Sequence, residues 1–293
     1  METKTDRRHP HQPFDLTLIS GFLRDRDILS VELLPAGKSN SNYKLILSDG
    51  EVCVLRLYNN GNAEREAYVT NLVREFVPVP AEIARGANWS VFSFLEGKLL
   101  EQVPEYSGAA AEALARISSV EFKSAGIINV DGTISLFPFG GSKGFIAEKL
   151  EHAEVRAWLG EKVVDVLVAV FQKEAGRLDE LDAQSRLVHG DFNPTNILIH
   201  RGKISGILDW EFCHAGTPYM DIGNLLRNTA SNYHRAIKQG LEAGGMSLPD
   251  DWKERAELVD VTSQLEFLTS NRSKGFKRQC AARIKKFISK FKD

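Results

Sequence analysis

A run of polar residues between apolar segments limits how this chain of 293 residues can fold. Residues 187–199 read LVHGDFNPTNILI, and the segment ISGIL follows after the turn HRGK and leads to Asp209. Short runs rich in β-branched residues and bounded by turn residues are typical of strands. The region therefore predicts an antiparallel hairpin whose polar residues gather at one end.

The polar residues at that end have the chemistry of a magnesium site. If the chain reverses near Gly202, antiparallel pairing sets Asn196 opposite Asp209, and Asp191 lies at the same end. Two carboxylates and an amide oxygen are hard ligands, which suit Mg²⁺ better than zinc. Because protein-bound Mg²⁺ commonly holds substrate phosphates as well, the pattern predicts a phosphate-handling site.

Phosphoryl transfer gives each of these residues a role. The reaction needs a carboxylate that orients the attacking hydroxyl or accepts its proton, together with groups that hold the metal ion. Asp191 is the candidate base, and Asn196 and Asp209 are the candidate metal ligands. Asp, Asn and Pro also dominate ordinary turns, so Asp191, Asn193 and Asn196 have a purely local interpretation as well.

The residues before Gly97 predict a small antiparallel sheet with one helix. The helix is expected from Ala63 to Glu75, and the sequence VPVP that follows ends it because proline removes backbone donors. We place a first lobe at residues 1–96. Its expected strands are short β-rich runs that alternate with turns, at residues 28–34, 43–47 and 52–58, and a further run at residues 89–96 that leads to a break at Gly97.

The remaining residues, 97–293, predict a larger and mainly helical lobe. The segment GAAAEALARISSV is rich in strong helix formers, and residues 161–182 carry an apolar stripe at helical spacing. The glycines and proline of SLFPFGGSKGF, residues 135–145, indicate an exposed loop. No internal repeat is present, so the expected fold is α+β with two lobes.

A charged residue in the third expected strand needs a partner. Arg56 is flanked by apolar residues in VCVLRLY, and a cation in such surroundings requires a compensating acid. Glu66 on the following helix can supply it, and Glu64 is the competing candidate. An ordinary surface ion pair is the alternative interpretation.

The quoted motifs resemble those of a known family. HGDFNPTNILI followed by ILDWEF is similar to the catalytic and metal-binding loops of the aminoglycoside phosphotransferase and choline kinase family, which has the protein-kinase fold. The resemblance, which extends from about Leu33 to Arg227, implies that Asp191 is the catalytic base and that Asn196 and Asp209 bind magnesium. It also implies that Asp221, in GTPYMDIGNLLR, braces the catalytic loop, and His189 has the character of a structural histidine beside it.

The same resemblance locates the nucleotide. Arg56 and Glu66 match the strand lysine and helix glutamate of kinases, with arginine able to grip phosphate in a bidentate way. The segment AGKSNSNY stands where a phosphate loop is expected, but it has one glycine instead of GxGxxG, so side chains are expected to help. Those side chains are Ser39, Asn40 and Ser41, and the backbone of Phe94, Leu95 and Glu96 in FSFLEG is expected to meet the adenine.

Charge limits the classes of partner that are expected, and cysteine content indicates the cellular compartment. The net charge of −2 gives no reason to expect nucleic acid as a partner, although nine of the Lys and Arg residues follow Asn271, where only one acid is found. That tail has helical apolar spacing and is expected to pack on the acidic body, with an anionic membrane or a nucleic acid as alternatives. The three cysteines form no CxxC pair, and no segment is apolar enough to span a membrane, which together favour the cytoplasm.

The sequence thus predicts a Mg²⁺-dependent kinase of a small molecule. It is expected to move the γ-phosphoryl group of ATP to an acceptor hydroxyl, with an antibiotic such as an aminoglycoside as one acceptor class. Choline, ethanolamine, homoserine and sugars are the alternative acceptors. A metallohydrolase built on His189, Asp191, Asn196 and Asp209, or a catalytically inactive nucleotide-binding protein, are the rival functions. The choice between ATP and GTP and the oligomeric state are open.

Overall fold

A computed structural model describes residues 7, 9–34, 39–59 and 63–291 of the chain. The chain forms two compact units, and each unit is made of two segments that are separated in the sequence. The first unit comprises Met1–Tyr106 and Pro194–Glu211, and the second comprises Ser107–Asn193 and Phe212–Asp293. The boundary between two lobes that the sequence predicts after residue 96 stays a prediction.

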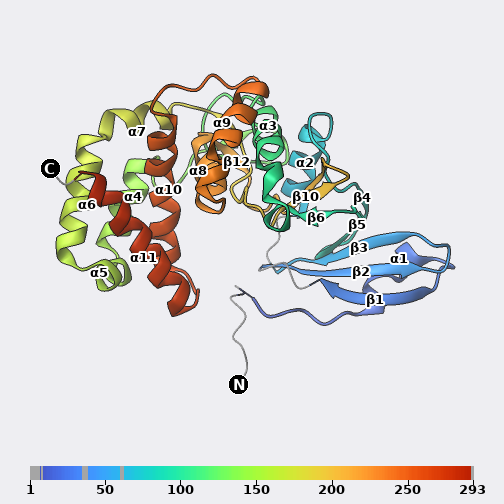
Figure 1. Ribbon diagram of the computed structural model, residues 1–293. Helices are drawn as coiled ribbons and strands as arrows, with labels where there is room; N and C mark the ends of the chain where they lie inside the picture. Colours follow the sequence, from blue (N-terminus) through green and yellow to red (C-terminus); the bar gives the residue numbers. More distant parts are fainter. Residues whose placement is uncertain (1–6, 8, 35–38, 60–62, 292–293) are drawn as a thin grey trace. The chain divides into compact units, whose positions relative to one another are not determined.

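A five-stranded antiparallel sheet forms the first unit, with strand order β1-β2-β3-β5-β4 (Figure 1). The expected runs are all strands, and the predicted helix is present but ends two residues early. The sequence did not suggest β4, which is short. The bounds are β1 Ile28–Leu34, β2 Ser41–Leu47, β3 Val52–Leu57, α2 Ala63–Val73, β4 Glu82–Arg85 and β5 Trp89–Ser93, preceded by a 3₁₀ turn at Leu16–Ile19 and by α1 Ser20–Leu23.

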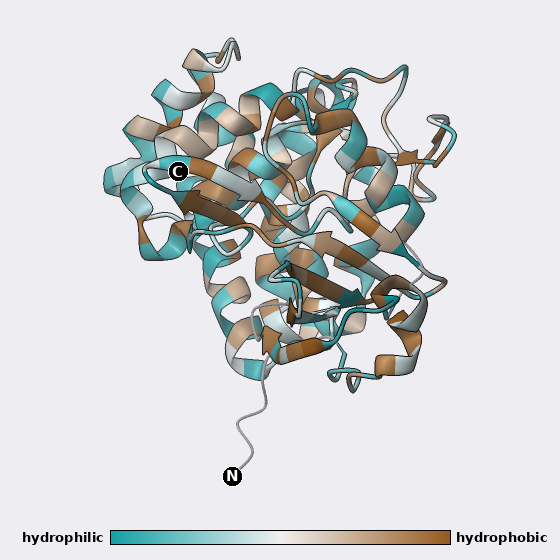
Figure 2. Ribbon diagram, turned by 90° about the vertical axis from the view of Figure 1, so that its right-hand side faces the viewer, coloured by the Kyte–Doolittle hydropathy of each residue, from teal (hydrophilic) through white to brown (hydrophobic). Residues whose placement is uncertain are grey.

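Alternation of burial along the central strands explains why the sheet forms. In β2, Tyr43, Leu45 and Leu47 are buried, whereas the residues between them are half-buried. Cys53 and Leu55 of β3 join the same core. Successive side chains of a strand point to opposite faces, so a period of two gives the sheet one apolar face. The sheet strands are accordingly among the strongly hydrophobic segments in Figure 2.

The predicted hairpin is present, but its register differs from the prediction. Strand β10 pairs with β11, and Ile197 faces Ile207. Asn196 is therefore opposite Leu208, whose backbone N–H donates to the Asn196 carbonyl at 2.8 Å, and it is not opposite Asp209. A β-bulge between Leu198 and Ile199 shifts the pairing by one residue. The three-stranded sheet has the order β11-β10-β6, with bounds β6 Lys98–Leu99, β10 Ile197–His200 and β11 Lys203–Ile207.

Helices dominate the second unit, as predicted. The expected helix at residues 161–182 is two helices, because the chain leaves helical geometry at Glu174 and Gly176, a poor helix former, follows at once. Part of the expected loop at 135–145 is also helical. The bounds are α3 Ser107–Ile117, α4 Ser142–Glu151, α5 Ala153–Leu159, α6 Glu161–Lys173, α7 Ala175–Asp182, α8 Tyr219–Arg227, α9 His234–Ala243, α10 Trp252–Thr269 and α11 Lys274–Ile288.

Two small antiparallel ladders complete the second unit. One joins β7 Ile127–Ile128 to β8 Ile134–Ser135, and the other joins β9 Arg186–Val188 to β12 His214–Gly216. Strand β9 matters most here, because it leads directly into the polar residues that follow Val188.

The basic tail is a terminal helix, as predicted. Helix α11 buries Cys280, Ile284, Phe287 and Ile288 and packs against α10, α5 and α6. Within the described ranges, no helix combines the length and the hydropathy needed to cross a bilayer.

Candidate active site

Asp191 lies in the loop that follows strand β9, and one position of this loop, residue 190, accommodates only glycine. Gly190 has φ of +82°, and a Cβ atom there would lie 2.4 Å from the backbone oxygen of Phe212. Beyond this turn, Asp191 accepts a hydrogen bond from the side-chain amide of Asn193 at 2.7 Å and from that of Asn224 at 3.4 Å. The carboxylate is thus oriented by two amide groups, which donate protons and leave it able to act as an acceptor.

The Asp221 carboxylate holds this loop through hydrogen bonds to its backbone. It lies in the first turn of α8 and is fully buried. Its two carboxylate oxygens accept the backbone N–H groups of His189 at 2.6 Å and Gly190 at 2.9 Å. Burial raises the pKa of Asp221 to about 7, opposed by the hydrogen bonds from His189, Gly190 and Phe192. The neutral and charged forms are therefore both accessible near pH 7.

His189 is part of the same arrangement. Its ring is fully buried, and its Nδ1 accepts the backbone N–H of Asp191 at 3.2 Å. A ring nitrogen that accepts from an N–H group carries no proton, so the proton of a neutral His189 is on Nε2. The ring also meets Phe192 edge-on at 5.8 Å.

Arg56 joins three partners in the first unit. Its Nη1 pairs with Oε1 of Glu66 at 2.5 Å and with Oδ1 of Asp209 at 3.5 Å. Its Nε donates to the side-chain oxygen of Asn42 at 3.0 Å. Glu66 is the partner, and Glu64 is exposed to solvent. Because the Arg56 side chain is only 11% exposed, the pair is not an ordinary surface ion pair.

The charges around Arg56 keep it protonated. Burial alone would lower the pKa of the guanidinium, but the carboxylates of Glu66 and Asp209 raise it above its ordinary value. Asp209, whose side chain is 20% exposed, has φ of +66° and follows the end of β11. The predicted phosphate cation and one predicted metal ligand are thus in direct contact.

Replacing Arg56 with lysine tests this arrangement. A single ammonium group cannot reach Asn42, Glu66 and Asp209 in the same geometry as a guanidinium. We expect Arg56→Lys to lower the free energy of unfolding by about 1 to 2 kcal/mol, roughly one charge-assisted hydrogen bond. Arg85→Lys, at an arginine paired with Glu82 that is one-third exposed, is the matched control and should change stability less. Urea denaturation measures both, and equal losses would contradict the prediction.

The predicted phosphate-loop side chains are engaged within the first unit. Ser39, Asn40 and Ser41 are buried, whereas residues 36–38 of the predicted loop lie outside the described residues. The Ser41 hydroxyl accepts the backbone N–H of Gln12 at 2.8 Å, and the Ser39 carbonyl accepts from Asn59 at 2.6 Å. These contacts shape the loop through its side chains, where other phosphate loops use glycines.

Glu211 is a residue that the sequence analysis missed. Its buried carboxylate accepts the side-chain amide of Asn40 at 3.0 Å, and its backbone carbonyl accepts Nη2 of Arg65 at 2.8 Å. Arg65 neighbours Glu66 on α2, so the helix, the loop and the segment after Asp209 are joined by hydrogen bonds. The available signal was the third letter of DWE, an acid in an otherwise apolar run.

The segment after β5 was expected to meet the adenine through its backbone. The Glu96 carbonyl accepts the hydroxyl of Ser205 at 2.7 Å, so β11 already uses one backbone acceptor of this segment. Leu95 lies against Gly206, where a Cβ atom would come within 2.7 Å of its side chain. The ammonium of Lys44 lies 4.4 Å from the centre of the Phe94 ring.

Asn196 and Asp209 offer the oxygen ligands that magnesium prefers. They flank the paired residues of β10 and β11, at one end of the hairpin in the first unit, whereas Asp191 belongs to the second unit. A carboxylate with an amide oxygen fits Mg²⁺, which keeps waters and substrate oxygens as its other ligands. In the described part of the chain, no group of three His, Cys, Asp or Glu residues is arranged to hold a metal ion.

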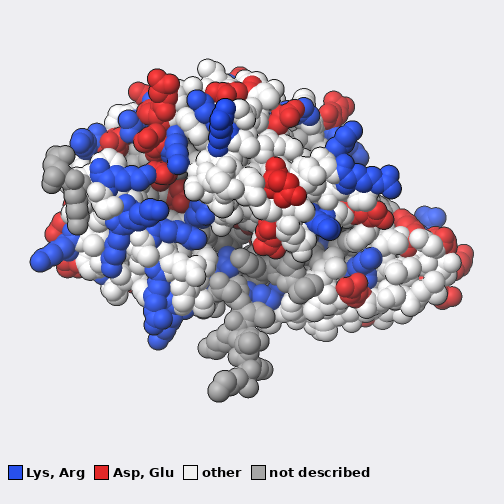
Figure 3. All heavy atoms as spheres, in the orientation of Figure 1, with Lys and Arg blue, Asp and Glu red and all other residues white. Residues whose placement is uncertain are grey.

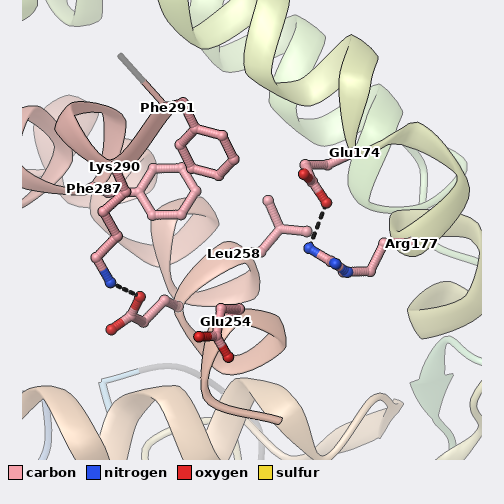
Figure 4. A pocket seen from close by; sticks show the side chains of 8 residues that line it. Glu174, Arg177, Glu254, Leu258, Phe287, Lys290 and Phe291 are labelled. Carbon is pink, nitrogen blue, oxygen red and sulfur yellow. Dashed lines mark hydrogen bonds and ion pairs between the residues drawn. The ribbon is translucent and has the colours of Figure 1, made fainter. Parts of the chain in front are cut away.

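A hollow of about 260 Å³ lies elsewhere in the second unit, among α7, α10 and α11. Figure 4 shows its apolar wall, formed by Leu258, Phe287 and Phe291. Its charged groups satisfy one another, since Arg177 pairs with Glu174 at 2.5 Å and Lys290 pairs with Glu257. We assign no ligand to it.

Two solved structures with a similar fold are phosphotransferases. A macrolide 2′-phosphotransferase from Brachybacterium faecium is 16% identical, with a TM-score of 0.68 and coverage of 92% of this chain and 97% of that one. The aminoglycoside 2′-phosphotransferase-IIIa, in a GDP complex, is 19% identical with a TM-score of 0.70, covering 94% and 96% of the two chains. The fold is therefore of the protein-kinase-like phosphotransferase class. The chain belongs to the phosphotransferase enzyme family, whose sequence profile matches residues 30–258.

Curated relatives match over a smaller share of their length. A probable acyl-CoA dehydrogenase of Arabidopsis thaliana is 23% identical over 265 residues, which is 78% of this chain and 32% of the relative. Acyl-CoA dehydrogenase family member 11 of Mus musculus is 23% identical over 249 residues, or 74% and 31% of the two proteins. The chain thus spans about a third of the length of these relatives.

Proposed function

We propose that this protein transfers the γ-phosphoryl group of ATP, bound together with Mg²⁺, to a hydroxyl group of a small molecule. The observation that carries the proposal is the loop around Asp191, which Asp221 braces through two backbone N–H groups. Such bracing fixes a carboxylate in position before the substrate arrives, and phosphoryl transfer depends mostly on positioning and on charge neutralisation.

Each candidate residue has a chemical task in this reaction. Asp191 orients the acceptor hydroxyl and takes its proton as the oxygen bonds to the γ-phosphorus, while the bond to the β-phosphate oxygen breaks and ADP leaves. Asn196 and Asp209 would hold the metal ion, which when bound supplies positive charge to the phosphate oxygens. Arg56, fixed by Glu66, offers a guanidinium to the phosphates.

The remaining predicted residues complete the proposed site. Ser39, Asn40 and Ser41 shape the phosphate loop, and the backbone of residues 94–96 meets the base. His189 and Asp221 support the loop that carries Asp191. We propose that residues 1–96 form a nucleotide-binding lobe and that residues 97–293 form a second lobe, which carries the catalytic loop.

Two structures of one solved relative support the donor and the acceptor class. Structures of the aminoglycoside phosphotransferase APH(4)-Ia contain AMP-PNP or ADP together with hygromycin B. They share 15% identity with this chain, so they support a nucleotide donor and a small-molecule acceptor without identifying either one here. The dehydrogenase names belong to relatives of which this chain spans only about a third, so they do not bear on this proposal. The three cysteines are free and buried, which supports our placement of the protein in the cytoplasm.

Calorimetry with AMP-PNP tests the metal site. We expect Asp209→Asn to weaken binding of AMP-PNP in Mg²⁺ by about 10- to 100-fold, the loss of a charged contact, and to leave binding in EDTA nearly unchanged. Asp49→Asn is the matched control, because Asp49 is also in the first unit and also pairs with an arginine, Arg26, at 3.4 Å. A Mg²⁺-dependent affinity that survives in Asp209→Asn would remove Asp209 from the metal site.

A further inference from the structure

Three arginines gather in the second unit where α8, α10 and α11 pack together. Arg227 is the last residue of α8, Arg272 lies between α10 and α11, and Arg283 is on α11. The guanidinium carbons of Arg227 and Arg272 are 5.8 and 5.9 Å from the centre of the Phe267 ring. Arg272 also lies 5.2 Å from the centre of the Phe276 ring. Aromatic faces thus hold two of the cations in place.

Arg283 lies three residues after the buried Cys280 on α11, on the same side of the helix, and the electrostatics of two buried groups agree with a grouping of the three arginines. Burial lowers the pKa of Arg227 to about 10, and the charge of Arg283 adds to this effect. Burial raises the pKa of the Cys280 thiol, and the charges of Arg283, Arg227 and Arg272 all oppose that rise. Arg227, Arg272 and Arg283 form what we call the arginine cluster.

A single residue, Asn224, links the arginine cluster to Asp191 by hydrogen bonds. Arg227 donates from Nη2 to the side-chain oxygen of Asn224 at 2.7 Å, and the amide nitrogen of Asn224 donates to Asp191 at 3.4 Å. All of these residues belong to the second unit. An acceptor whose hydroxyl reaches Asp191 therefore lies in the electrostatic field of the cluster.

The acids near the cluster offset only part of its charge. Arg227, with 9% of its side chain exposed, pairs with Asp260, which also accepts from Gln264 at 3.3 Å. Arg283 has no ion pair with any residue in the described ranges. Figure 3 shows Lys and Arg side chains gathered over α11. Lys277 of α11 pairs with Glu154 at 3.0 Å, and Lys290, which follows the helix, pairs with Glu257.

We propose that the acceptor of the phosphoryl group is an anion, a hydroxy compound that also carries a carboxylate or phosphate group. Arg283, which is half-buried, attracts that group, and Arg227 is a positioning residue that holds Asn224 against Asp191. Opposite charges in a partly desolvated site attract strongly, and a polycation such as an aminoglycoside is repelled. This inference rests on the proposed kinase function and selects a substrate class within it.

Binding of matched sugars tests the charge preference. Glucosamine, glucose, glucuronate and glucose 6-phosphate share a pyranose ring and carry a cation, no charge, a carboxylate and a phosphate, respectively. Calorimetry on the full chain saturated with Mg²⁺ and AMP-PNP should detect glucuronate or glucose 6-phosphate and neither of the other two. The carboxylate and phosphate arms tell which anion the cluster prefers. Tighter binding of glucosamine or glucose, or no binding of either anion, overturns the inference.

A charge reversal on α11 supplies the matched control. We expect Arg283→Glu to weaken anion binding by about tenfold or more, and Lys285→Glu, an exposed residue on the same helix, to leave it nearly unchanged. Equal effects in the two variants would mean that only the net charge matters and would overturn the assignment. Circular dichroism confirms that both variants are folded, and Arg283→Gln repeats the test if Arg283→Glu is not. If the unmodified protein does not bind AMP-PNP in the presence of Mg²⁺, the proposed kinase function itself is contradicted.

Discussion

An Asp191→Asn variant should form ADP about a thousandfold more slowly than the unmodified protein with any acceptor that supports turnover, because a general base contributes roughly 10²- to 10⁴-fold. Asparagine keeps the shape of the side chain and can still accept from Asn193 and Asn224, but it cannot take a proton. The loop should therefore stay in place. Coupled detection of ADP gives kcat, and calorimetry with Mg²⁺ and AMP-PNP gives the affinity for nucleotide.

The separation of rate from affinity is the decisive feature of this experiment. A base acts in the transition state, so kcat should fall while nucleotide affinity changes by no more than about threefold. Asp165→Asn, on the exposed face of α6, is the control for the same chemical change and should leave both quantities unaltered. A variant that keeps its full rate would remove Asp191 from the role of base, and a joint loss of affinity and rate would indicate a structural role.

Local patterns predicted much of the fold and part of the site. Strands β1, β2 and β3 follow from β-rich runs between turns, and the Arg56–Glu66 pair follows from a charge in an apolar strand near a helix acid. In each case the signal lies within about ten residues of sequence, where propensity and periodicity act. The α+β class followed from the same local evidence.

Features that depend on distant contacts were not predictable in this way. His200 pairs with Lys203, so the chain reverses earlier than a turn centred on Gly202 would allow, and the bulge between Leu198 and Ile199 then sets Asn196 opposite Leu208. No sequence rule specifies where a strand adds a residue. Glu211 meets Asn40 across 171 positions of the chain, so its role needs the folded sheet. The break at Glu174 was similarly hidden by a continuous apolar stripe.

The arginine cluster shows that a prediction from composition can be correct and still incomplete. The basic tail was evident from the sequence, and its packing as a helix was expected. What the sequence could not give is that Arg283 and Arg272 approach Arg227, more than 40 positions away, and that Asn224 links this group to Asp191. Charge patterning acquires a functional meaning only when the partners of each charge are known.

Asp221→Ala should be the most destabilising of the substitutions considered. The change leaves the backbone N–H groups of His189 and Gly190 buried without an acceptor, and each such loss costs about 1 to 3 kcal/mol. We expect the free energy of unfolding to fall by about 2 to 6 kcal/mol, measured by urea denaturation. Asp131→Ala is the matched control, because Asp131 also accepts a backbone N–H, from Thr133 at 2.9 Å, but is exposed. A loss no larger than that of the control would contradict the bracing role.

The pH dependence of this contribution has a definite sign. Burial raises the folded-state pKa of Asp221 to about 7, above its ordinary value near 4. Between these two pH values the folded protein binds more protons than the unfolded chain, so the contribution of the carboxyl group is complete below pH 4 and is lost as the pH rises through 7. The stability difference between the unmodified protein and Asp221→Ala should therefore shrink from pH 4 to pH 8. A difference that grows over this interval would show that the three backbone N–H groups outweigh burial and keep Asp221 charged, with a folded-state pKa below 4.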